Sequence, residues 1–508
     1  MTSAHRKRWT LIATILGSAM TFIDGTVVNV ALPALQKDLH ATITDVQWVV
    51  AAYALFLGAL LLVGGSLGDQ LGRKRVFLIG VGFFTGASVL CGLATSPRLL
   101  IGARALQGVG AAFLVPGSLA IINATFDGAE RGRAIGTWSG FSAITTAIGP
   151  VVGGWLIEAV SWRAAFFLNV PLAAAVIALS LAFMDESKDS SRGKGIDWIG
   201  GALAVLGLGG VVLGLIEWPA LGAGNRVVLA ALLLGVVLLV VLVIVEGRSR
   251  SPMMPLGVFR SRTFSLANAL TLLLYAALGM VMFLVPLVLI QVQHYTATQA
   301  GAAIVPFAVI MFAGSRWAGG LIGRVGPRLP LTVGPIVAAA GIAMFAMTRV
   351  GDSYWSAVFP AVCLMGAGMT ITVAPLTTTV MGAVETAQSG VASGINNAVS
   401  RVAGLLAIAV FGVLLANSFN ARIQPRLEEL RLPAAARQQV QRELPKMAGA
   451  ELHSSSLDEA RRGAVRNAID EAFVEAFRAV MLGCAVLALA AAGFGAAIRQ
   501  PPRRAKAT

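Results

Sequence analysis

The chain has 508 residues, of which 57% are hydrophobic and only 12% are charged. A water-soluble globule of this size does not have so apolar a composition, so the sequence predicts a membrane protein. The net charge of +15 does not indicate nucleic-acid binding, because the basic residues gather in short loops between apolar runs. The three cysteines lie singly inside apolar runs, which predicts neither a disulfide framework nor a metal site.

Apolar runs long enough to cross a bilayer recur along the whole chain, about fourteen in number, since a spanning helix needs about 20 apolar residues. They lack the alternating pattern of a membrane β-barrel. The expected fold class is therefore an all-α polytopic membrane protein. The expected spans are residues 9–32, 47–67, 76–96, 99–125, 134–158, 165–184, 197–218, 226–246, 264–290, 300–322, 331–349, 355–380, 391–416 and 475–498.

The first charges of interest lie inside spans. Asp24 lies fifteen residues past Trp9, about 22 Å along a helix, and Arg104 lies seven residues past Pro97, about 10 Å from the opposite face. In a core about 30 Å thick the two have a similar depth, so they can pair if the first and fourth helices face each other. A charge at this depth usually faces a protein interior or a solute pathway. A permanent structural ion pair is the alternative.

Two segments of the chain repeat one another. GSLGDQLGRK at 65–74 matches GGLIGRVGPR at 319–328, and each follows the second span of a run of six. Duplicated halves are typical of secondary transporters, whose solute site lies where the halves meet. The expected domains are an N-terminal six-helix bundle over 1–184, an inserted two-helix hairpin over 185–250, and a C-terminal six-helix bundle over 251–508. The hairpin is expected to pack outside the transport core.

The topology follows from the basic loops. With these spans, the Lys and Arg clusters all lie on the side of the N-terminus, as does the basic C-terminal tail. Cytoplasmic loops carry an excess of Lys and Arg, so both termini are expected in the cytoplasm. Residues 417–474 then form a long extracytoplasmic loop, with two short amphipathic helices broken at Pro433 and Pro445. This loop either shields the outer mouth or is a tether.

Five strings resemble motifs of one known family, the major facilitator superfamily, and one of them, SWRAAFFLNVP (161–171), is similar to the family pattern in general. IDGTVVNVALP (23–33) resembles its branch with fourteen spanners, the multidrug efflux drug:proton antiporters. GSLGDQLGRKR (65–75) resembles the signature loop, RALQGVGAA (104–112) the fourth-helix motif, and GPVVGG (149–154) the fifth-helix motif associated with antiporters. The resemblance covers Trp9 to Met381 well and the last helices less specifically. It implies two six-helix bundles plus the two-helix insert, working by alternating access.

The resemblance also implies roles for particular residues. It assigns proton coupling to Asp24 and Arg104, since the family's corresponding acid and arginine are implicated in it. In the family the signature loop is thought to latch the outward-facing state, although an ordinary basic loop is the alternative, and the antiporter helix seals the cavity against leak as well as packing tightly. The signature-loop residues are Gly65, Gly68, Asp69, Gly72, Arg73, Lys74 and Arg75, and those of the antiporter helix are Gly149, Pro150, Gly153 and Gly154.

Further polar residues inside spans are candidates for cavity lining. Each of the amides can instead bridge two helices, and Arg316 can instead snorkel to the interface. Arg401 matches a family arginine. With arginines outnumbering deep acids, the cavity is expected to favour lipophilic neutral or anionic solutes over dications. The candidates are Asn29, Gln107, Asn123, Asn396, Asn397, Arg401 and Arg316.

The sequence thus predicts proton-coupled efflux of hydrophobic compounds across the cytoplasmic membrane, by a monomer that is not an enzyme. The four histidines lie at ends or in loops, and no zinc-type spacing occurs, so no metal and no cofactor other than the coupling proton is expected. The expected partners are a lipophilic small molecule and the bilayer, and not nucleic acid. Export of an endogenous lipid or metabolite, a sensor that uses residues 417–474, and Na⁺ coupling remain alternatives.

Overall fold

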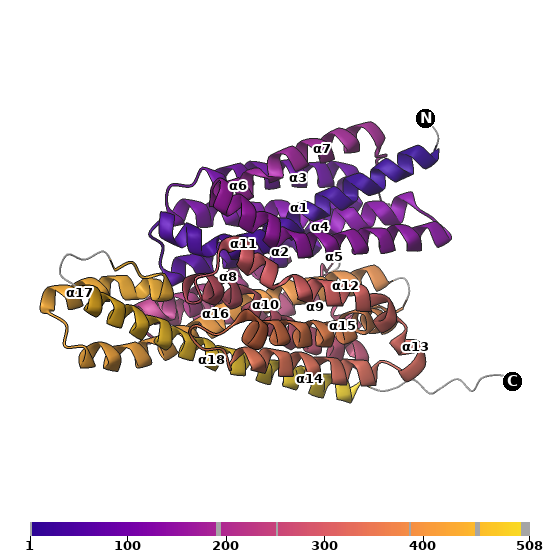
Figure 1. Ribbon diagram of the computed structural model, residues 1–508. Coiled ribbons are helices and arrows are strands. Elements are labelled where there is room, and N and C mark those ends of the chain that lie inside the picture. Colours follow the sequence, from indigo (N-terminus) through magenta and orange to yellow (C-terminus); the bar gives the residue numbers. More distant parts are fainter. Residues whose placement is uncertain (1–2, 189–194, 250–251, 386–387, 453–457, 499–508) are drawn as a thin grey trace.

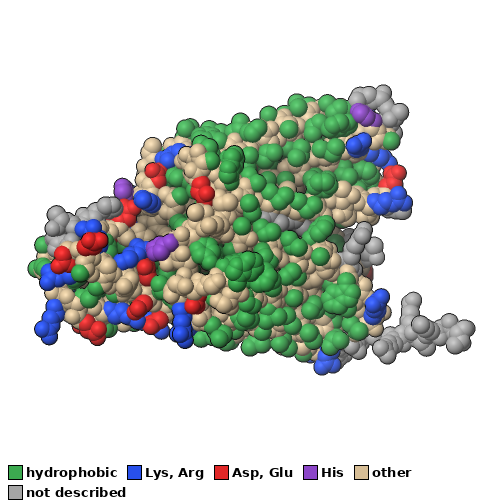
Figure 2. Space-filling view, viewed as in Figure 1, with side chains coloured by type: hydrophobic (Ala, Val, Ile, Leu, Met, Phe, Trp, Pro, Cys, Tyr) green, Lys and Arg blue, Asp and Glu red, His purple; other side chains and the backbone are tan. Residues whose placement is uncertain are grey.

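The computed structural model describes residues 3–188, 195–249, 252–385, 388–452 and 458–498, and over these residues it is helical and contains no strand. Its helices include 14 that are long and apolar enough to cross a membrane. Large apolar side chains are exposed on them, such as Leu233 at 69% and Leu181 at 63%, and Figure 2 shows a broad apolar surface on both halves. Because such a surface requires lipid around it, the predicted all-α polytopic membrane protein is confirmed.

The first seven helices form one group, drawn in indigo to magenta in Figure 1. Within it α2 and α3 pack on α4, and α1 packs on α5 and α7. Thr42 and Asp45 form a capping box that begins α2, and Ser96 caps α4 just before Pro97. The bounds are α1 (Ser3–Asp38), α2 (Ile43–Leu71), α3 (Arg73–Gly92), α4 (Pro97–Thr125), α5 (Gly128–Ala159), α6 (Trp162–Phe167) and α7 (Asn169–Phe183).

A second group follows the hairpin, drawn in red to yellow in Figure 1. Here α14 packs on α15 and α18, and α10 packs on α16 and α18. Both ends of the chain lie at the same end of the molecule, which we call the terminal end, and we call the opposite end the distal end. The bounds are η1 (Leu256–Arg260), α10 (Arg262–Gln291), α11 (Ala297–Ala303), α12 (Val305–Gly319), α13 (Leu321–Val325), α14 (Arg328–Phe345), η2 (Tyr354–Val358), α15 (Phe359–Gly382), α16 (Ser389–Glu429) and α18 (Glu459–Ala497).

Two spans that the sequence analysis treated as continuous are interrupted. The span at 165–184 is divided at Leu168 into α6 and α7, and the span at 300–322 is divided at Ile304 and Gly320. Pro171 and Pro306 lie just after the first two breaks. A proline ring clashes with the carbonyl four residues earlier, which explains why the helix restarts there.

The inserted hairpin consists of α8 (Trp198–Leu221) and α9 (Arg226–Arg248), which pack on each other. Helix α8 also packs on α2 of the first group and α16 of the second. Their contact is apolar and includes Leu55 of α2, Val212 of α8 and Leu405 of α16, all buried. The hairpin therefore covers the line where the two groups meet, while much of α9 faces outward.

The predicted extracytoplasmic loop at 417–474 is largely wrong as a loop. Helix α16 continues to Glu429, and α18 already begins at Glu459, so each runs well beyond a bilayer. Arg422 and Arg426 of α16 both pair with Glu475 of α18 at 3.0 Å, which holds the two extensions together outside the apolar region. Only α17 (Ala434–Glu443) and η4 (Leu444–Gly449) are short helices, and they begin next to Pro433 and Pro445 as expected.

Residues 430–452, which we call the distal segment, tie the two groups together at the distal end. Gln36 of α1 donates to the Lys446 carbonyl at 3.0 Å and accepts from Gln291 of α10 at 2.8 Å. Gly449 lies against both glutamines, where a Cβ would meet them at 2.8 and 3.1 Å. At the terminal end, by contrast, Figure 2 shows a notch between the two groups. The structure is thus closed at the distal end.

One carboxylate inside the distal segment stays ionised. Burial opposes this, but hydrogen bonds from Lys446 Nζ and from the Glu451 N–H hold the pKa of Glu443 below its usual range. The Lys446 and Glu443 side chains are 2.8 Å apart. This pair fixes the turn from which the Lys446 carbonyl reaches Gln36.

Candidate functional site

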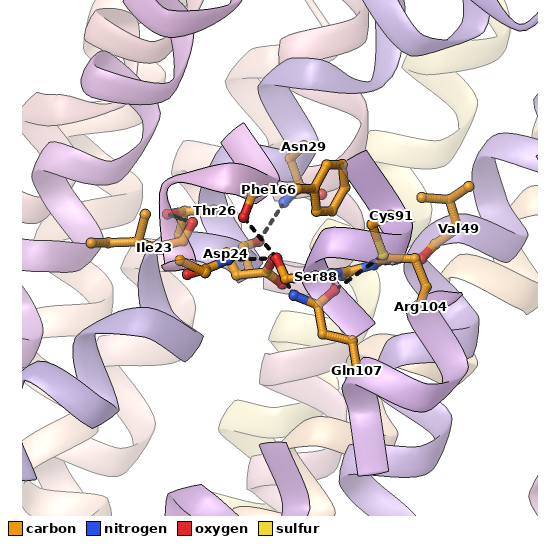
Figure 3. A network of polar contacts seen from close by, with 12 residues as sticks. Ile23, Asp24, Thr26, Asn29, Val49, Ser88, Cys91, Arg104, Gln107 and Phe166 are labelled. Atoms are coloured by element: carbon orange, nitrogen blue, oxygen red, sulfur yellow. Dashed lines mark hydrogen bonds and ion pairs between the residues drawn. The ribbon is translucent and has the colours of Figure 1, made fainter. Parts of the chain in front are cut away.

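A buried polar network joins α1 to α4 inside the first group. Arg104 Nη1 donates to Asp24 Oδ2 at 2.6 Å and to Gln107 Oε1 at 2.6 Å, and Gln107 Nε2 donates to Asp24 Oδ1 at 2.8 Å. All three side chains are at most 2% exposed. Figure 3 shows them converging from the two helices. The structure therefore brings together the acid and the arginine that the sequence placed at one depth, and adds Gln107.

Two further helices complete the surroundings of Arg104. Its Nε donates to the Val49 carbonyl of α2 at 3.2 Å, and its guanidinium lies 4.2 Å from the centre of the Tyr53 ring. Cys91 of α3 lies 3.6 Å from Gln107 Oε1. Arginine suits this position because its planar fork can stack on an aromatic ring while donating in several directions. A lysine would lose most of these contacts.

Open space lies directly beside the network. Gly25, next to Asp24, is exposed, and a Cβ built on it meets no atom within 4 Å. The Asn29 amide one turn further lies 3.5 Å from the Gly25 carbonyl. The Asp24 carboxylate is thus buried, but the backbone that carries it borders an open region.

The signature loop is held by an acid that the sequence analysis did not identify. Asp69 Oδ1 accepts from Arg73 Nη2 at 2.9 Å. Glu186, which follows α7, accepts from the backbone N–H groups of Lys74 and Arg75 at 3.0 and 3.1 Å. It therefore lies at the N-terminus of α3, where free N–H groups and the helix dipole favour a negative charge. The acidic residues after the sixth span were the available signal for it.

Two other contacts position the signature loop. Gly72, at a φ of 116°, forms the turn between α2 and α3, and a Cβ there would meet the Glu186 carboxyl at 2.6 Å. Lys74 Nζ donates to the Met184 carbonyl at 2.7 Å, while Arg75 is exposed. Gly65 and Gly68 allow ordinary contacts with Pro116 and Arg73. The loop is thus anchored within the first group in this state.

The antiporter helix makes close contacts on two sides. A Cβ on Gly149 or Gly153 would overlap α1 at Thr26 or Val27. On the other side, Gly154 lies against the Ala297 backbone of α11, and Gly301 lies against the Pro150 carbonyl. Glu158 Oε1 extends the second contact by accepting from the Thr298 N–H at 2.6 Å. Helix α5 therefore joins the two groups near the distal end, where small residues permit close approach.

The remaining predicted lining residues are not gathered at the network. Asn396 bridges two helices, donating to Asn268 at 3.1 Å and Thr271 at 2.8 Å. Arg401 lies where α16 meets α2, since a Cβ on Gly58 would be 3.4 Å from its Cβ. Asn123 and Asn397 are exposed. The Arg316 side chain lies outside the described residues.

A second buried polar chain was not predicted from the sequence. Ser88 of α3 donates to the Phe166 carbonyl at 2.8 Å, and Asn169 of α7 donates to Ser88 at 3.0 Å. It satisfies the Phe166 carbonyl at the break between α6 and α7. We infer a structural role, because every contact serves the packing of α3 on that break.

Candidate spanning helices arranged in two groups, with a buried ion pair inside one of them, are typical of multi-pass membrane transporters. Comparison with known families identifies the particular one. The model of the Major Facilitator Superfamily matches residues 14–408, and the chain belongs to that family.

Similar proteins of this family are named for drug resistance and drug export. The chain is 36% identical over 420 residues to the multidrug resistance protein Stp of Mycobacterium tuberculosis (strain CDC 1551 / Oshkosh), covering 82% of this chain and 78% of that protein. It is 33% identical over 424 residues to the tetracenomycin C resistance and export protein of Streptomyces glaucescens, covering 84% and 79%. The membership of the major facilitator superfamily and the resemblance to its multidrug efflux transporters, which the motifs indicated, are thereby confirmed.

Solved structures show the same fold. A bacterial homolog of the human lysosomal transporter Spinster matches with a TM-score of 0.62 at 19% identity, covering 98% of this chain and 99% of that one. A peptide transporter of the POT type matches with a TM-score of 0.63 at 12% identity, covering 97% and 96%. At these identities the likeness concerns the fold alone.

Proposed function

We propose that this protein exports lipophilic compounds across the plasma membrane in exchange for protons, by alternating access. The observation that carries the proposal is the Asp24–Arg104–Gln107 network, buried between two spanning helices beside the open space at Gly25. The names of the related proteins support drugs as the cargo. The central requirement is that proton and cargo binding oppose each other, which thermodynamic linkage makes reciprocal.

The network supports proton coupling through its charges. In the closed arrangement Asp24 has a donor on each carboxylate oxygen, which suits the ionised form. A rearrangement that draws Arg104 away would leave the same carboxylate buried without a partner. A buried, unpaired carboxylate is costly, and protonation removes that cost. The arrangement of the helices around Arg104 and the protonation of Asp24 are thereby linked.

Asp24→Asn tests this proposal. The amide keeps the size of the side chain and removes its charge, so export driven by a pH gradient is expected to stop. The protein should still insert and fold, with a lower free energy of unfolding because Arg104 loses its counter-charge. The measurement is flux in proteoliposomes with an imposed pH gradient, against a panel of lipophilic cations, neutral compounds and anions. Glu428→Gln, which changes an exposed acid on the distal extension of α16, is the control. Unchanged export by the Asp24 variant would exclude this carboxylate from coupling.

We further propose that the terminal end faces the cytoplasm, because the short basic loops lie there. The two ends of α9 provide a test, since Arg226 begins it at the distal end and Arg248 ends it at the terminal end. In a variant without the native cysteines, Arg226→Cys should react with a membrane-impermeant maleimide in intact cells. Arg248→Cys should react only after the membrane is opened. The reverse pattern would invert the topology.

A further inference from the structure

A polar groove lies at the distal end, apart from the buried network. It has a volume of ≈ 610 Å³, within the usual range of ligand sites. Four segments line it: the start of α2, the start of α4, the end of α8 in the inserted hairpin, and η4 of the distal segment. The lining residues are Thr42, Thr44, Asp45, Trp48, Arg98, Ile101, Glu217, Ala220 and Pro445.

Opposite charges are held apart along this groove. Arg98 is exposed and makes no ion pair within the described part of the chain. Glu217 Oε1 accepts from Trp48 Nε1 at 2.8 Å, which fixes its carboxylate in the groove and leaves its second oxygen for another donor. Asp45 uses Oδ2 for its capping box with Thr42 and keeps Oδ1. Because the acids do not neutralise Arg98, the groove suits a ligand that carries both signs.

The position of the groove indicates what that ligand is. It lies where spanning helices begin and end, which is the depth of lipid headgroups, and tryptophan is enriched at that depth. On the membrane side of the groove, Leu213 of α8 is exposed one turn from Glu217. An exposed apolar side chain therefore follows the groove toward the bilayer centre, on the side where an acyl chain would lie.

We propose that this groove binds the phosphoethanolamine headgroup of a phospholipid in the leaflet at the distal end. Arg98 binds the phosphate, for which a guanidinium is well suited. Glu217 accepts from the primary ammonium, which also lies against the Trp48 ring. Because Pro445 forms part of the wall, the lipid contacts the first group, the inserted hairpin and the distal segment at once.

Two variants test separately how the groove binds the phosphate and the ammonium of the headgroup. Arg98→Ala removes the phosphate partner and is expected to weaken the binding of phosphatidylethanolamine and phosphatidylglycerol alike. Glu217→Gln keeps an oxygen for Trp48 but removes the charge, so it should weaken phosphatidylethanolamine alone. Each loss is expected to be about tenfold, the usual value of one charge-assisted hydrogen bond. Arg226→Ala, an exposed cation at the start of α9 on the same side, is the control.

The full-length protein would be placed in nanodiscs of equal phosphatidylethanolamine and phosphatidylglycerol, and the lipid retained after gentle release measured by native mass spectrometry. The wild type should retain phosphatidylethanolamine preferentially, with the losses above, while all variants keep the same thermal unfolding midpoint. Equal retention of both lipids by the wild type, or retention unaffected by either variant, would overturn the proposal. The assay involves no transport, so its result is independent of whether proton-coupled export is correct.

Discussion

Among single residues, Arg104 is the most completely partnered charge in the membrane region. Its guanidinium bonds Asp24, Gln107 and the Val49 carbonyl and lies on the Tyr53 ring. Removing charges from water costs several kcal/mol per ion, and only such geometry repays it. Deleting one partner of the pair should therefore cost more than neutralising both.

This contrast gives a stability prediction. Arg104→Gln should lower the free energy of unfolding by about 3–5 kcal/mol, because Asp24 is left as an uncompensated buried charge. Adding Asp24→Asn should recover most of that loss without restoring export. Unfolding of the purified proteins in detergent measures both values. A double variant that is no more stable than Arg104→Gln would show that the ion pair is not what the single variant lost.

At the scale of elements, the sequence predicted the positions of the spans better than their lengths. Hydropathy marks where a helix enters lipid. Helices α16 and α18 continue beyond the lipid, because Arg422 and Arg426 of α16 pair with Glu475 of α18. Such pairs join residues about fifty positions apart, and no local pattern reveals them. The equal depth of Asp24 and Arg104, by contrast, followed from helix rise alone.

The position of Glu186 shows a second limit of sequence analysis, which cannot tell where a loop residue lies in the fold. This acid lies in a polar loop, and its place at the N-terminus of α3 depends on α7 packing back along α3. The signature-loop motif includes the N-terminus of α3, but it does not include Glu186, the acid that binds there. The hydrogen bonds of the Asn396 side chain were equally hidden, because helix rotation about its own axis is set by packing.

Glu186→Gln tests the element that this acid stabilises. The amide keeps only one acceptor oxygen, so it can accept from one of the Lys74 and Arg75 N–H groups but not from both. It also loses the charge at the helix N-terminus, worth about 0.3–1 kcal/mol. We expect faster amide hydrogen exchange at the start of α3, measured by mass spectrometry. Asp185→Asn, which changes the adjacent exposed acid paired with Arg6, should leave that exchange unchanged. Equal exchange in both variants would exclude the role of Glu186.

At the scale of the whole molecule, α2 packs on α16 along much of its length, and further contacts between the two groups lie at the distal end. Gln36 meets Gln291 there, and Gly154 and Gly301 pack across α5 and α11. Helix α8 bridges α2 and α16 along one side. Alternating access requires the distal contacts to part while the notch at the terminal end closes. The distal segment contacts both groups, because its Lys446 carbonyl accepts from Gln36 of α1 and its Ala450 carbonyl accepts from Arg466 of α18, and it must move in that step.

A crosslink across the distal end should therefore stop transport. A Cβ on Gly449 lies 2.8 Å from Gln36 Oε1, so Gln36→Cys and Gly449→Cys are within reach of a short cleavable thiol reagent. In a background without the native cysteines, the crosslinked protein should lose pH-driven export in proteoliposomes and regain it on reduction. Glu428→Cys of α16 with Arg437→Cys of α17, whose parent side chains are 3.8 Å apart, controls for the reagent because that crosslink joins the distal segment to the second group alone. Export that persists through the Gln36–Gly449 crosslink would mean that the distal segment stays in place while cargo leaves, and the exit path would then have to lie elsewhere.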